Sequence, residues 1–229
     1  FVGKFKRELV LEGQLKAIPS NALTGCVLLI QDVLKCKATA KNKIVGNLLE
    51  HNLLNSSEWI HGYHIANAVD CDFIDLETEF HVGDGSYVAY VRSGDWLDTS
   101  KYTKNIRFNG GSHNYNRRTG HVIEIGKYIY HENVNYDNNG LVRGTGTWSG
   151  VDVEPFGSDE TKVRYADHIY FDECVAQGNR GGGIRFERVY NGAIRNCTLS
   201  KNGYGIELHR CGIVSEWSVS SKQVLVKNK

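Results

Sequence analysis

Short segments that alternate apolar and polar residues recur along most of this chain, and six of them begin with glycine. In GVDVEP the apolar residues are Val151 and Val153, and in GIRFER they are Ile184 and Phe186. Strict alternation is typical of a β-strand with one buried face. The segments begin at Gly62, Gly85, Gly120, Gly150, Gly183 and Gly205, in steps of 23, 35, 30, 33 and 22 residues. A short recurring step with longer steps between predicts a coil of stacked strands whose connecting loops vary in length.

A second family of strands lies between the glycine-led ones and predicts three columns of buried side chains. Residues two apart on a strand share one face, and each coil buries its apolar face only against its neighbours. The columns are Val69, Ile106, Ile129, Ile169, Gly192; then Cys71, Phe108, His131, Phe171, Ile194; and, after a bend, Ile74, Gly111, Val134, Cys174, Cys197. Because His131 falls in an apolar column, we interpret it as a core residue.

Together the two strand families predict an all-β fold, a single-stranded right-handed parallel β-helix (solenoid) with loop insertions at one corner. We expect the β-helix domain over residues 61–229 and a capping or lead-in segment over residues 1–60. Asn139, Asn179 and Asn202 lie just before glycine-led strands. Asparagine tolerates tight corners, so stacking predicts an internal ladder of amides.

Charge and hydropathy exclude two classes of partner. The 27 Lys and Arg residues balance 26 Asp and Glu residues, so no field for binding nucleic acid is expected. No run of 18 apolar residues occurs, and a membrane span is therefore not predicted. The chain begins at Phe1 and contains no methionine, so we expect a fragment or a processed form.

The six cysteines form no CxxC pair. Cys174 and Cys197 are one repeat apart and should lie on neighbouring coils, about 4.8 Å apart. That separation is near the lower limit for a disulfide, and stacked parallel side chains rarely present the required torsion angle. We interpret the cysteines as free thiols that fill the core.

Three segments of the chain resemble a known group of proteins. GVDVEP, DHIYFDECVAQGNRGGGIRF and GAIRNCTLSKNGYGIELHR resemble right-handed parallel β-helix proteins of the pectate-lyase-like superfold, above all phage tail-spike and related polysaccharide-degrading proteins. The resemblance extends over residues 60–211. It implies a polysaccharide substrate, an extracellular or virion-associated location and assembly into a homotrimer. The paired aspartates and Arg-Ile-Lys signature of polygalacturonases are missing, and the calcium-and-arginine set of pectate lyases has no clear match.

Charged residues alternate with the apolar positions of the glycine-led strands and should face outward. Two columns are expected: Glu124, Asp152, Arg185, Glu207, and Gly126, Glu154, Glu187, His209. Glycosidases place two carboxyl groups about 5–5.5 Å or about 6.5–9.5 Å apart, for retention and inversion respectively. The Cα atoms of Asp152 and Glu154 should lie about 6.6 Å apart, and the diagonal from Asp152 to Glu187 should be about 8 Å. Both geometries are available, and inversion is slightly favoured.

We therefore predict a polysaccharide depolymerase of the glycoside hydrolase type, with Asp152, Glu154 and Glu187 as catalytic residues. Stacked carboxylates raise one pKa, as a general acid requires, whereas Arg185 should keep Asp152 ionised as the base. Glu124, Trp148, Arg185, Glu207 and His209 are the expected substrate-binding residues. Aromatic residues on the inserted loops could hold sugar rings; these are Trp96, Tyr102, Tyr115, Tyr136, Trp148, Phe156 and Tyr165.

Two other functions use the same outward residues. The acids could hold Ca²⁺, which prefers oxygen ligands, and Arg185 or His209 would then abstract a proton in a polysaccharide lyase. Alternatively, the charges form a solvated ladder on a non-catalytic glycan-binding or structural β-helix of a phage tail or adhesin. The nine histidines show no metal-ligand spacing, so the hydrolase is expected to need no metal or other cofactor. Residues 214–229 still alternate and leave an open strand edge, which predicts an oligomer or further chain.

Overall fold

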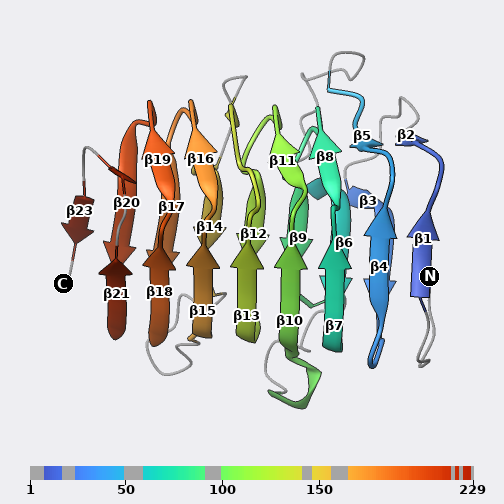
Figure 1. Cartoon of the computed structure of the whole chain (residues 1–229), viewed down its shortest axis with the longest axis horizontal. Coiled ribbons are helices and arrows are strands. Elements are labelled where there is room, and N and C mark those ends of the chain that lie inside the picture. Colours follow the sequence, from blue (N-terminus) through green and yellow to red (C-terminus); the bar gives the residue numbers. More distant parts are fainter. Residues whose placement is uncertain are drawn as a thin grey trace.

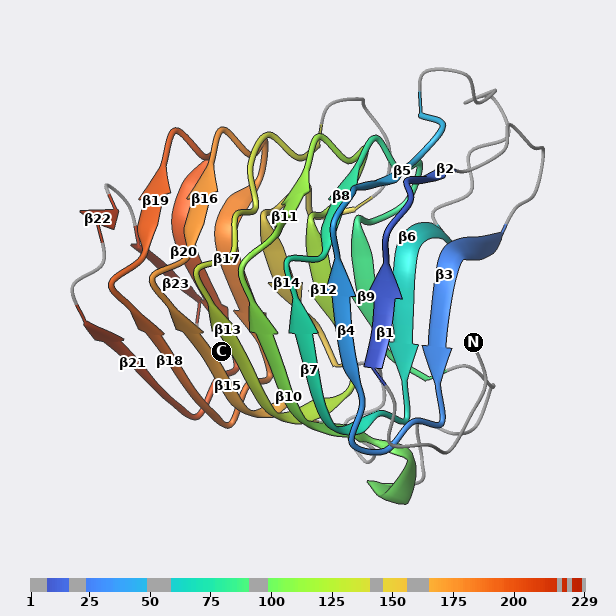
Figure 2. The same cartoon turned by 45° about the vertical axis from the view of Figure 1, so that its right-hand side comes forward.

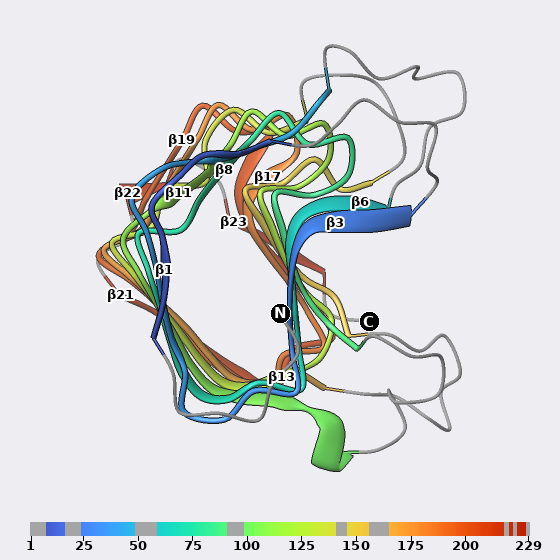
Figure 3. The same ribbon diagram turned by 90° about the vertical axis from the view of Figure 1, so that its right-hand side faces the viewer.

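The structure, a computed structural model, describes residues 8–16, 24–48, 59–90, 99–140, 146–155, 165–217, 220–221 and 224–227. Strands make up most of the regular structure in these residues, together with the short 3₁₀ helix η3 (Thr99–Lys101). The strands stack along one axis (Figures 1 and 2). A view along that axis shows them surrounding a single interior (Figure 3). The fold is the predicted parallel β-helix.

The first sheet, which we call sheet 1, contains the strands of the second family. Its neighbours pair in parallel with a regular step along the axis. In spatial order it consists of β1 (Glu8–Leu11), β4 (Lys37–Ala40), β7 (Val69–Ile74), β10 (Thr103–Asn109), β13 (Gly126–Glu132), β15 (Asp167–Asp172), β18 (Asn191–Arg195) and β21 (Ile213–Trp217).

Sheet 2 contains the glycine-led strands and carries the candidate site. Its strands also pair in parallel. In spatial order they are β3 (Thr24–Gln31), β6 (Trp59–Ala66), β9 (Ser86–Val88), β12 (His121–Ile123), β14 (Val151–Val153), β17 (Gly182–Glu187), β20 (Tyr204–His209) and β23 (Val224–Lys227).

Sheet 3 is made of short strands in two parts. The first part is β2 (Leu15–Lys16), β5 (Ile44–Val45), β8 (Glu77–Glu79) and β11 (Ser112–Asn114), and the second is β16 (Val175–Gln177), β19 (Thr198–Ser200) and β22 (Ser220–Ser221). Single parallel bridges from Asn135 to Ser112 and to Val175 join the two parts.

The glycine column stacks as the sequence predicts, and its packing explains why glycine is needed. Val151 pairs with Ile184 and His121 pairs with Val151, so Gly120, Gly150 and Gly183 lie in register. A Cβ atom on Gly150 would lie 2.7 Å from the carbonyl oxygen of Gly183. The same short approach to the next glycine carbonyl recurs at Gly62, Gly85, Gly120 and Gly183. Any larger side chain in this column would force the coils apart.

Four of the five strands in the predicted second family stack in the expected register. Ile106 pairs with Ile129 and Ile169 pairs with Gly192. The prediction is wrong at β7, where Ile106 pairs with Cys71 rather than Val69. Consequently Phe73 takes the place expected for Cys71, and its ring stacks on Phe108 with the centroids 5.2 Å apart. A shift of two residues keeps the same side chains inside, so the alternation alone could not detect it.

The interior combines an apolar core with the predicted amide ladder. Asn116, Asn139, Asn179 and Asn202 each donate or accept a side-chain hydrogen bond with the next amide, at 3.0–3.1 Å. Such buried polar groups must be hydrogen-bonded, and this ladder satisfies them. His131 is buried between Phe108 and Phe171, as expected for a core residue. The six cysteines are free thiols.

The first 60 residues, for which the sequence predicts a capping or lead-in segment, contribute β1–β5 to the same parallel sheets. Strand β3 pairs with β6 over Thr24–Gln31, so the coil begins ahead of residue 61. Among the described residues, no helix is both long and apolar enough to cross a membrane.

Candidate functional site

The candidate site lies on the outward face of sheet 2, over β14, β17 and β20. Asp152 pairs with Arg185, and Arg185 pairs with Glu207, so these three form the first predicted column. Glu187 pairs with His209 in the second column, and Glu154 directly follows β14 beside Glu187. Alternation points these side chains outward because the valines, isoleucines and phenylalanine between them fill the core.

Two positions in the predicted columns are wrong. Val122, rather than Glu124, pairs with Asp152. Glu124 follows β12 as Glu154 follows β14, so it belongs to the second column beside Glu154. The same register removes Gly126 from that column, because Gly126 starts β13 in sheet 1. The observed second column lies four residues after each glycine of the glycine column, and this spacing also places Glu124 beside Glu154.

Arg185 joins the carboxylates of the site. Its Nη1 donates to Asp152 Oδ1 at 2.9 Å and to Glu154 Oε2 at 3.2 Å, and its Nη2 donates to Glu187 Oε2 at 2.6 Å. Arg185 Nε is 3.9 Å from Glu207 Oε2. Although burial opposes its charge, the carboxylates, Asp152 first, raise the pKa of Arg185 above its ordinary value. The guanidinium thus holds four acids from three coils in one cluster, which we call the Arg185 cluster.

Burial dominates the acid–base behaviour of Asp152. The residue is only 3% exposed, and its Oδ2 accepts a hydrogen bond from Thr147 Oγ1 at 2.8 Å. Burial raises the pKa of Asp152 to about 7, helped by the nearby Glu154 and opposed by Arg185. The sequence predicts that Arg185 keeps Asp152 ionised, but removing the carboxylate from water costs more than one shared guanidinium returns. Asp152 is therefore suited to be the acid rather than the base.

A second carboxyl group on this face has the same property. Burial raises the pKa of Glu124 to about 7, although a hydrogen bond from Tyr87 opposes this rise. The charge of Glu154 on the next coil raises it further. Glu154, whose side chain is 48% exposed, thus neighbours two acids of raised pKa: Asp152 on the same coil and the half-buried Glu124 on the next coil.

Glu207 and His209 form the far end of the site. His209 Nε2 is 2.5 Å from Glu207 Oε1. Burial alone would raise the pKa of Glu207, but hydrogen bonds from Tyr204 and His209 lower it below its ordinary value. These two predicted residues do lie together, and Glu207 remains a charged neighbour of Arg185.

Several residues of the site were missed by the sequence analysis. Thr147 binds Asp152, Tyr204 binds Glu207, and Arg188 Nη1 binds Glu187 Oε1 at 2.9 Å. One signal pointed to Tyr204: the residue before each glycine of the column is often polar, as in Asp84 and Ser149. Arg188 had no such signal, because it follows the strand at a corner.

Trp148 lies one residue from Thr147, at the edge of the Arg185 cluster. Its ring carries the guanidinium of Arg180, 4.5 Å from the ring centroid. Its backbone has a φ of 54°, a conformation that side chains rarely adopt. The indole nitrogen is buried without a hydrogen-bond partner in the described residues. Its role as a sugar platform stays a prediction.

The other predicted loop aromatics do not gather at the site. Tyr136 is fully buried in the core, so the expectation that it lies on a loop surface is wrong. Tyr115 stacks on Phe80, with the centroids 5.6 Å apart. Tyr102 and Tyr165 line a hollow on sheet 1. Trp96 and Phe156 lie outside the described residues.

The acids of the Arg185 cluster do not fit a calcium ion. Ca²⁺ takes six to eight oxygen ligands. Here one carboxylate oxygen each of Asp152, Glu154 and Glu187 already accepts a hydrogen bond from the Arg185 guanidinium. Across the described residues, no group of three or more His, Cys, Asp or Glu side chains has the arrangement of a metal site.

Comparison with known proteins finds likeness only in structure. No protein-family model matches the chain, and no curated protein sequence matches it. Among solved structures, the A-module of the mannuronan C-5 epimerase AlgE4 of Azotobacter vinelandii matches with a TM-score of 0.57 and 12% identity, over 92% of this chain and 60% of that one.

A second solved structure is the tailspike protein gp49 of the Acinetobacter baumannii bacteriophage Fri1, a capsular polysaccharide depolymerase. It matches with a TM-score of 0.56 and 14% identity, over 82% of this chain and 33% of that one. The chain thus spans less than two thirds of either solved chain. At this identity the likeness establishes the architecture alone. In fold, therefore, this chain is a parallel β-helix protein of the kind to which both solved proteins belong.

Proposed function

We propose that this protein acts on a polysaccharide and hydrolyses its glycosidic bonds at the Arg185 cluster. The observation that carries the proposal is that Asp152 and Glu154 share one guanidinium nitrogen while burial raises the pKa of Asp152 to about 7. A pair of carboxyl groups in contrasting environments is the arrangement that separates an acid from a nucleophile or base.

The shared nitrogen also limits the distance between the two carboxyl groups. Arg185 Nη1 is 2.9 Å from one and 3.2 Å from the other. Their nearest oxygens are therefore at most about 6 Å apart, below the spacing of about 6.5–9.5 Å typical of inverting enzymes. This favours a retaining reaction, whereas the sequence slightly favours inversion.

The reaction follows from these positions. Asp152 gives its proton to the glycosidic oxygen as the bond to the anomeric carbon breaks, while a Glu154 oxygen bonds to that carbon. Water then attacks the anomeric carbon, Asp152 takes its proton, and the bond to Glu154 breaks. Glu187, held by Arg185 and Arg188, fixes the guanidinium that sets the spacing of the pair. Glu187 is thus proposed as a positioning residue.

The substrate class is supported by the shape of the protein and by its structural neighbours. Sheet 2 presents an outward face that runs along the whole axis (Figure 1), which suits an extended chain. Both neighbouring structures carry names of proteins that act on polysaccharides, an epimerase and a depolymerase. We propose the same substrate class here, with hydrolysis rather than epimerisation because Asp152 and Glu154 form a carboxyl pair.

A product assay tests the proposal. The protein is incubated with a panel of neutral and acidic polysaccharides, and new reducing ends, unsaturated ends and sugar composition are measured. We expect new reducing ends with retained anomeric configuration. Asp152→Asn and Glu154→Gln should each lower the rate by about 10²-fold or more.

The matched control is Glu77→Gln, which removes a carboxylate on β8 in sheet 3 that contacts Lys43 and Ser112. It should leave the rate unchanged. Unsaturated ends would instead identify a lyase, and a changed sugar composition without new ends would identify an epimerase. Equal rates for wild type and both site variants, or no product from any polysaccharide, would contradict the proposed hydrolase and leave a binding or structural role.

A further inference from the structure

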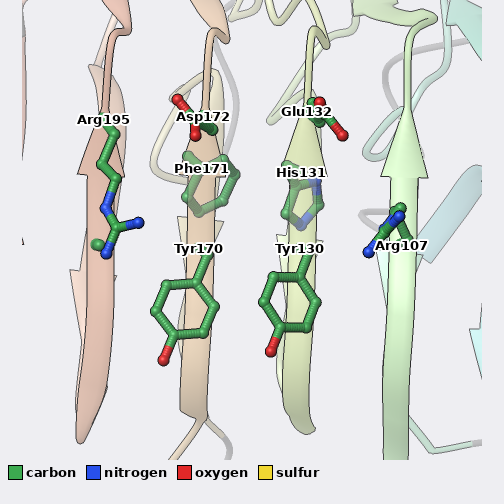
Figure 4. Close-up of a pocket in the computed structure, with 9 residues that line it drawn as sticks. Arg107, Tyr130, His131, Glu132, Tyr170, Phe171, Asp172 and Arg195 are labelled. Carbon is green, nitrogen blue, oxygen red and sulfur yellow. The ribbon is translucent and has the colours of Figure 1, made fainter.

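A hollow on the outward face of sheet 1 lies on a different side of the coil from the Arg185 cluster. It has a volume of about 390 Å³ and is formed by side chains from four successive coils, on β10, β13, β15 and β18. Figure 4 shows Arg107, Tyr130, Tyr170 and Arg195 on neighbouring strands, with Glu132 and Asp172 at one end. None of these residues takes part in the proposed hydrolysis. We call this hollow the tyrosine hollow.

Two tyrosines form the centre of the tyrosine hollow. Tyr130 pairs with Tyr170 across β13 and β15, and their rings stack with the centroids 5.0 Å apart and the planes inclined by 17°. Tyr130 is 39% exposed, although its ring is large and apolar. The ladder ends at Ala193, which pairs with Tyr170 on the next coil. Only a methyl group stands at that position, so no third ring continues the stack.

Polar groups surround the tyrosine pair, and those of Arg107, Glu132 and Asp172 remain available to a ligand. In the part of the chain that the structure describes, neither Arg107 nor Glu132 makes an ion pair or a side-chain hydrogen bond, and both are exposed. Asp172 accepts one hydrogen bond, from Asn196 Nδ2 at 2.9 Å, which leaves its second oxygen for another donor. Burial and the neighbouring Tyr130 raise the pKa of the Tyr170 hydroxyl, and the nearby Arg195 guanidinium opposes this rise. The two carboxylates therefore lie side by side at one end of the tyrosine pair, with an arginine on each flanking strand.

We propose that the tyrosine hollow binds a carbohydrate chain, as a second glycan-binding surface separate from the Arg185 cluster. A sugar ring has an apolar face that packs on an aromatic ring, and its neighbouring hydroxyls both donate to carboxylates and accept from guanidinium groups. The hollow presents all three partners within one coil of each other. Its two arginines balance two acids, which gives no field for a polyanion such as nucleic acid. The cores of protein interfaces are enriched in Tyr and Arg but depleted of Asp and Glu, so the two carboxylates at the hollow favour a glycan over a protein partner.

The surface continues along the same strands toward a neighbouring hollow of about 390 Å³. Lys104, Lys127 and Asp167 lie three residues before Arg107, Tyr130 and Tyr170, and the neighbouring hollow also includes Tyr102, Tyr165 and Tyr190. Tyr165 and Tyr190 are 49% and 56% exposed. A glycan longer than one or two sugars would therefore meet further exposed rings next to the tyrosine hollow.

Affinity electrophoresis in gels that contain a neutral galactomannan or acidic alginate tests this binding. The whole chain carrying Asp152→Asn is used, so that binding is measured without turnover. At least one of the two polysaccharides should retard the protein. Tyr130→Ala combined with Tyr170→Ala should weaken the binding by roughly tenfold or more. Tyr115→Asn removes an exposed tyrosine that directly follows β11 in sheet 3, and asparagine tolerates the φ of 57° at this position. This variant should leave the binding unchanged.

Thermal melting and light scattering accompany each variant. The tyrosine side chains face water, so the double variant should melt close to the wild type. If it melts lower, Arg107→Gln and Glu132→Gln, both on exposed side chains, decide the outcome, and each should weaken binding severalfold. Unchanged affinity in these variants, or no retardation by either polysaccharide, would refute the proposal. Dimers that dissociate in the double variant would identify the surface as an interface between copies and would also refute it. Binding by a protein that hydrolyses nothing would support the proposal and contradict only the proposed function.

Discussion

Arg185 Nη1 donates a hydrogen bond to Asp152 Oδ1 at 2.9 Å and so joins β17 to β14 at the centre of the outward face of sheet 2. The two residues are 33 positions apart in the sequence and one coil apart in the structure. Arg185 also contacts Glu154, Glu187 and Glu207. One cation therefore controls the spacing, the charge and the stability of the whole cluster.

Replacing Arg185 by glutamine should destabilise the protein by about 3–5 kcal/mol at pH 7, because it leaves buried carboxylates without their partner. The loss should become smaller as the pH falls, since protonation removes the unpaired charges. Urea unfolding at pH 5 and pH 8 measures this difference. Lys37→Gln, which removes one exposed ion pair with Glu8, is the control and should change stability by less than about 1 kcal/mol. An Arg185→Gln variant as stable as the wild type at both pH values would show that the cluster contributes no net stability.

Activity should fall as the pH rises above about 7, because burial raises the pKa of Asp152 to about 7 and the general acid must be protonated. The pH profile of kcat/KM on a cleaved polysaccharide measures this limb. Burial also raises the pKa of Glu124 to about 7, so Glu124→Gln is the comparison. If that variant is active and keeps the alkaline limb, Asp152 is the acid. Loss of the limb in Glu124→Gln would assign the acid to Glu124 instead.

Gly150→Ala should destabilise the coil by about 1–3 kcal/mol. Its Cβ would approach the Gly183 carbonyl to 2.7 Å and the Asn179 amide to 2.9 Å, so β14 and β17 would have to separate. Chemical unfolding measures the effect. Gly13→Ala is the matched control, since no atom lies within 4 Å of its added methyl group, and it should be neutral. Equal stability of the two variants would mean that the coils can spread without cost.

The buried histidines should make the protein less stable in acid. Burial lowers the pKa of His113, His121 and His131 well below the ordinary value. In the unfolded chain they bind protons below about pH 6.5, whereas in the folded protein they do not. Their contribution to stability is therefore complete above that pH and is lost as the pH falls below it. Asp152 and Glu124 act in the opposite direction, because their raised pKa values favour the folded state as the pH falls.

His131→Phe isolates the histidine effect. His131 stacks between Phe108 and Phe171, at 4.7 and 4.4 Å, so a phenyl ring fits the column. The variant loses the 2.7 Å hydrogen bond between Nδ1 and the Tyr136 hydroxyl, which should cost about 1 kcal/mol at pH 7.5. Its stability should nevertheless fall less than that of the wild type between pH 7.5 and pH 5. An equal or steeper fall would contradict the assignment of neutral histidine in the core.

Much of the candidate site could be predicted because strand periodicity assigns residues to faces. Asp152, Arg185 and Glu207 were expected in one outward column, and they lie there. Glu124 was misplaced by two residues, and β7 by two residues as well. Both shifts preserve the alternation of inside and outside, so the pattern could not reveal them. The count from the glycine column settles the first, and only the paired backbones settle the second.

The sequence alone determined the parallel β-helix, the glycine column and the amide ladder. Each depends on residue type at a repeated position: a glycine where two backbones meet, an amide at a tight corner, an apolar side chain on the inner face. The tertiary structure decided which acids have raised pKa values and which side chains share a cation. Those properties depend on burial and on distances between coils, which neighbours along the chain do not specify. Burial therefore gives Asp152 the raised pKa that a general acid needs. From the sequence pattern, Arg185 in the same column was expected to keep Asp152 ionised as the general base.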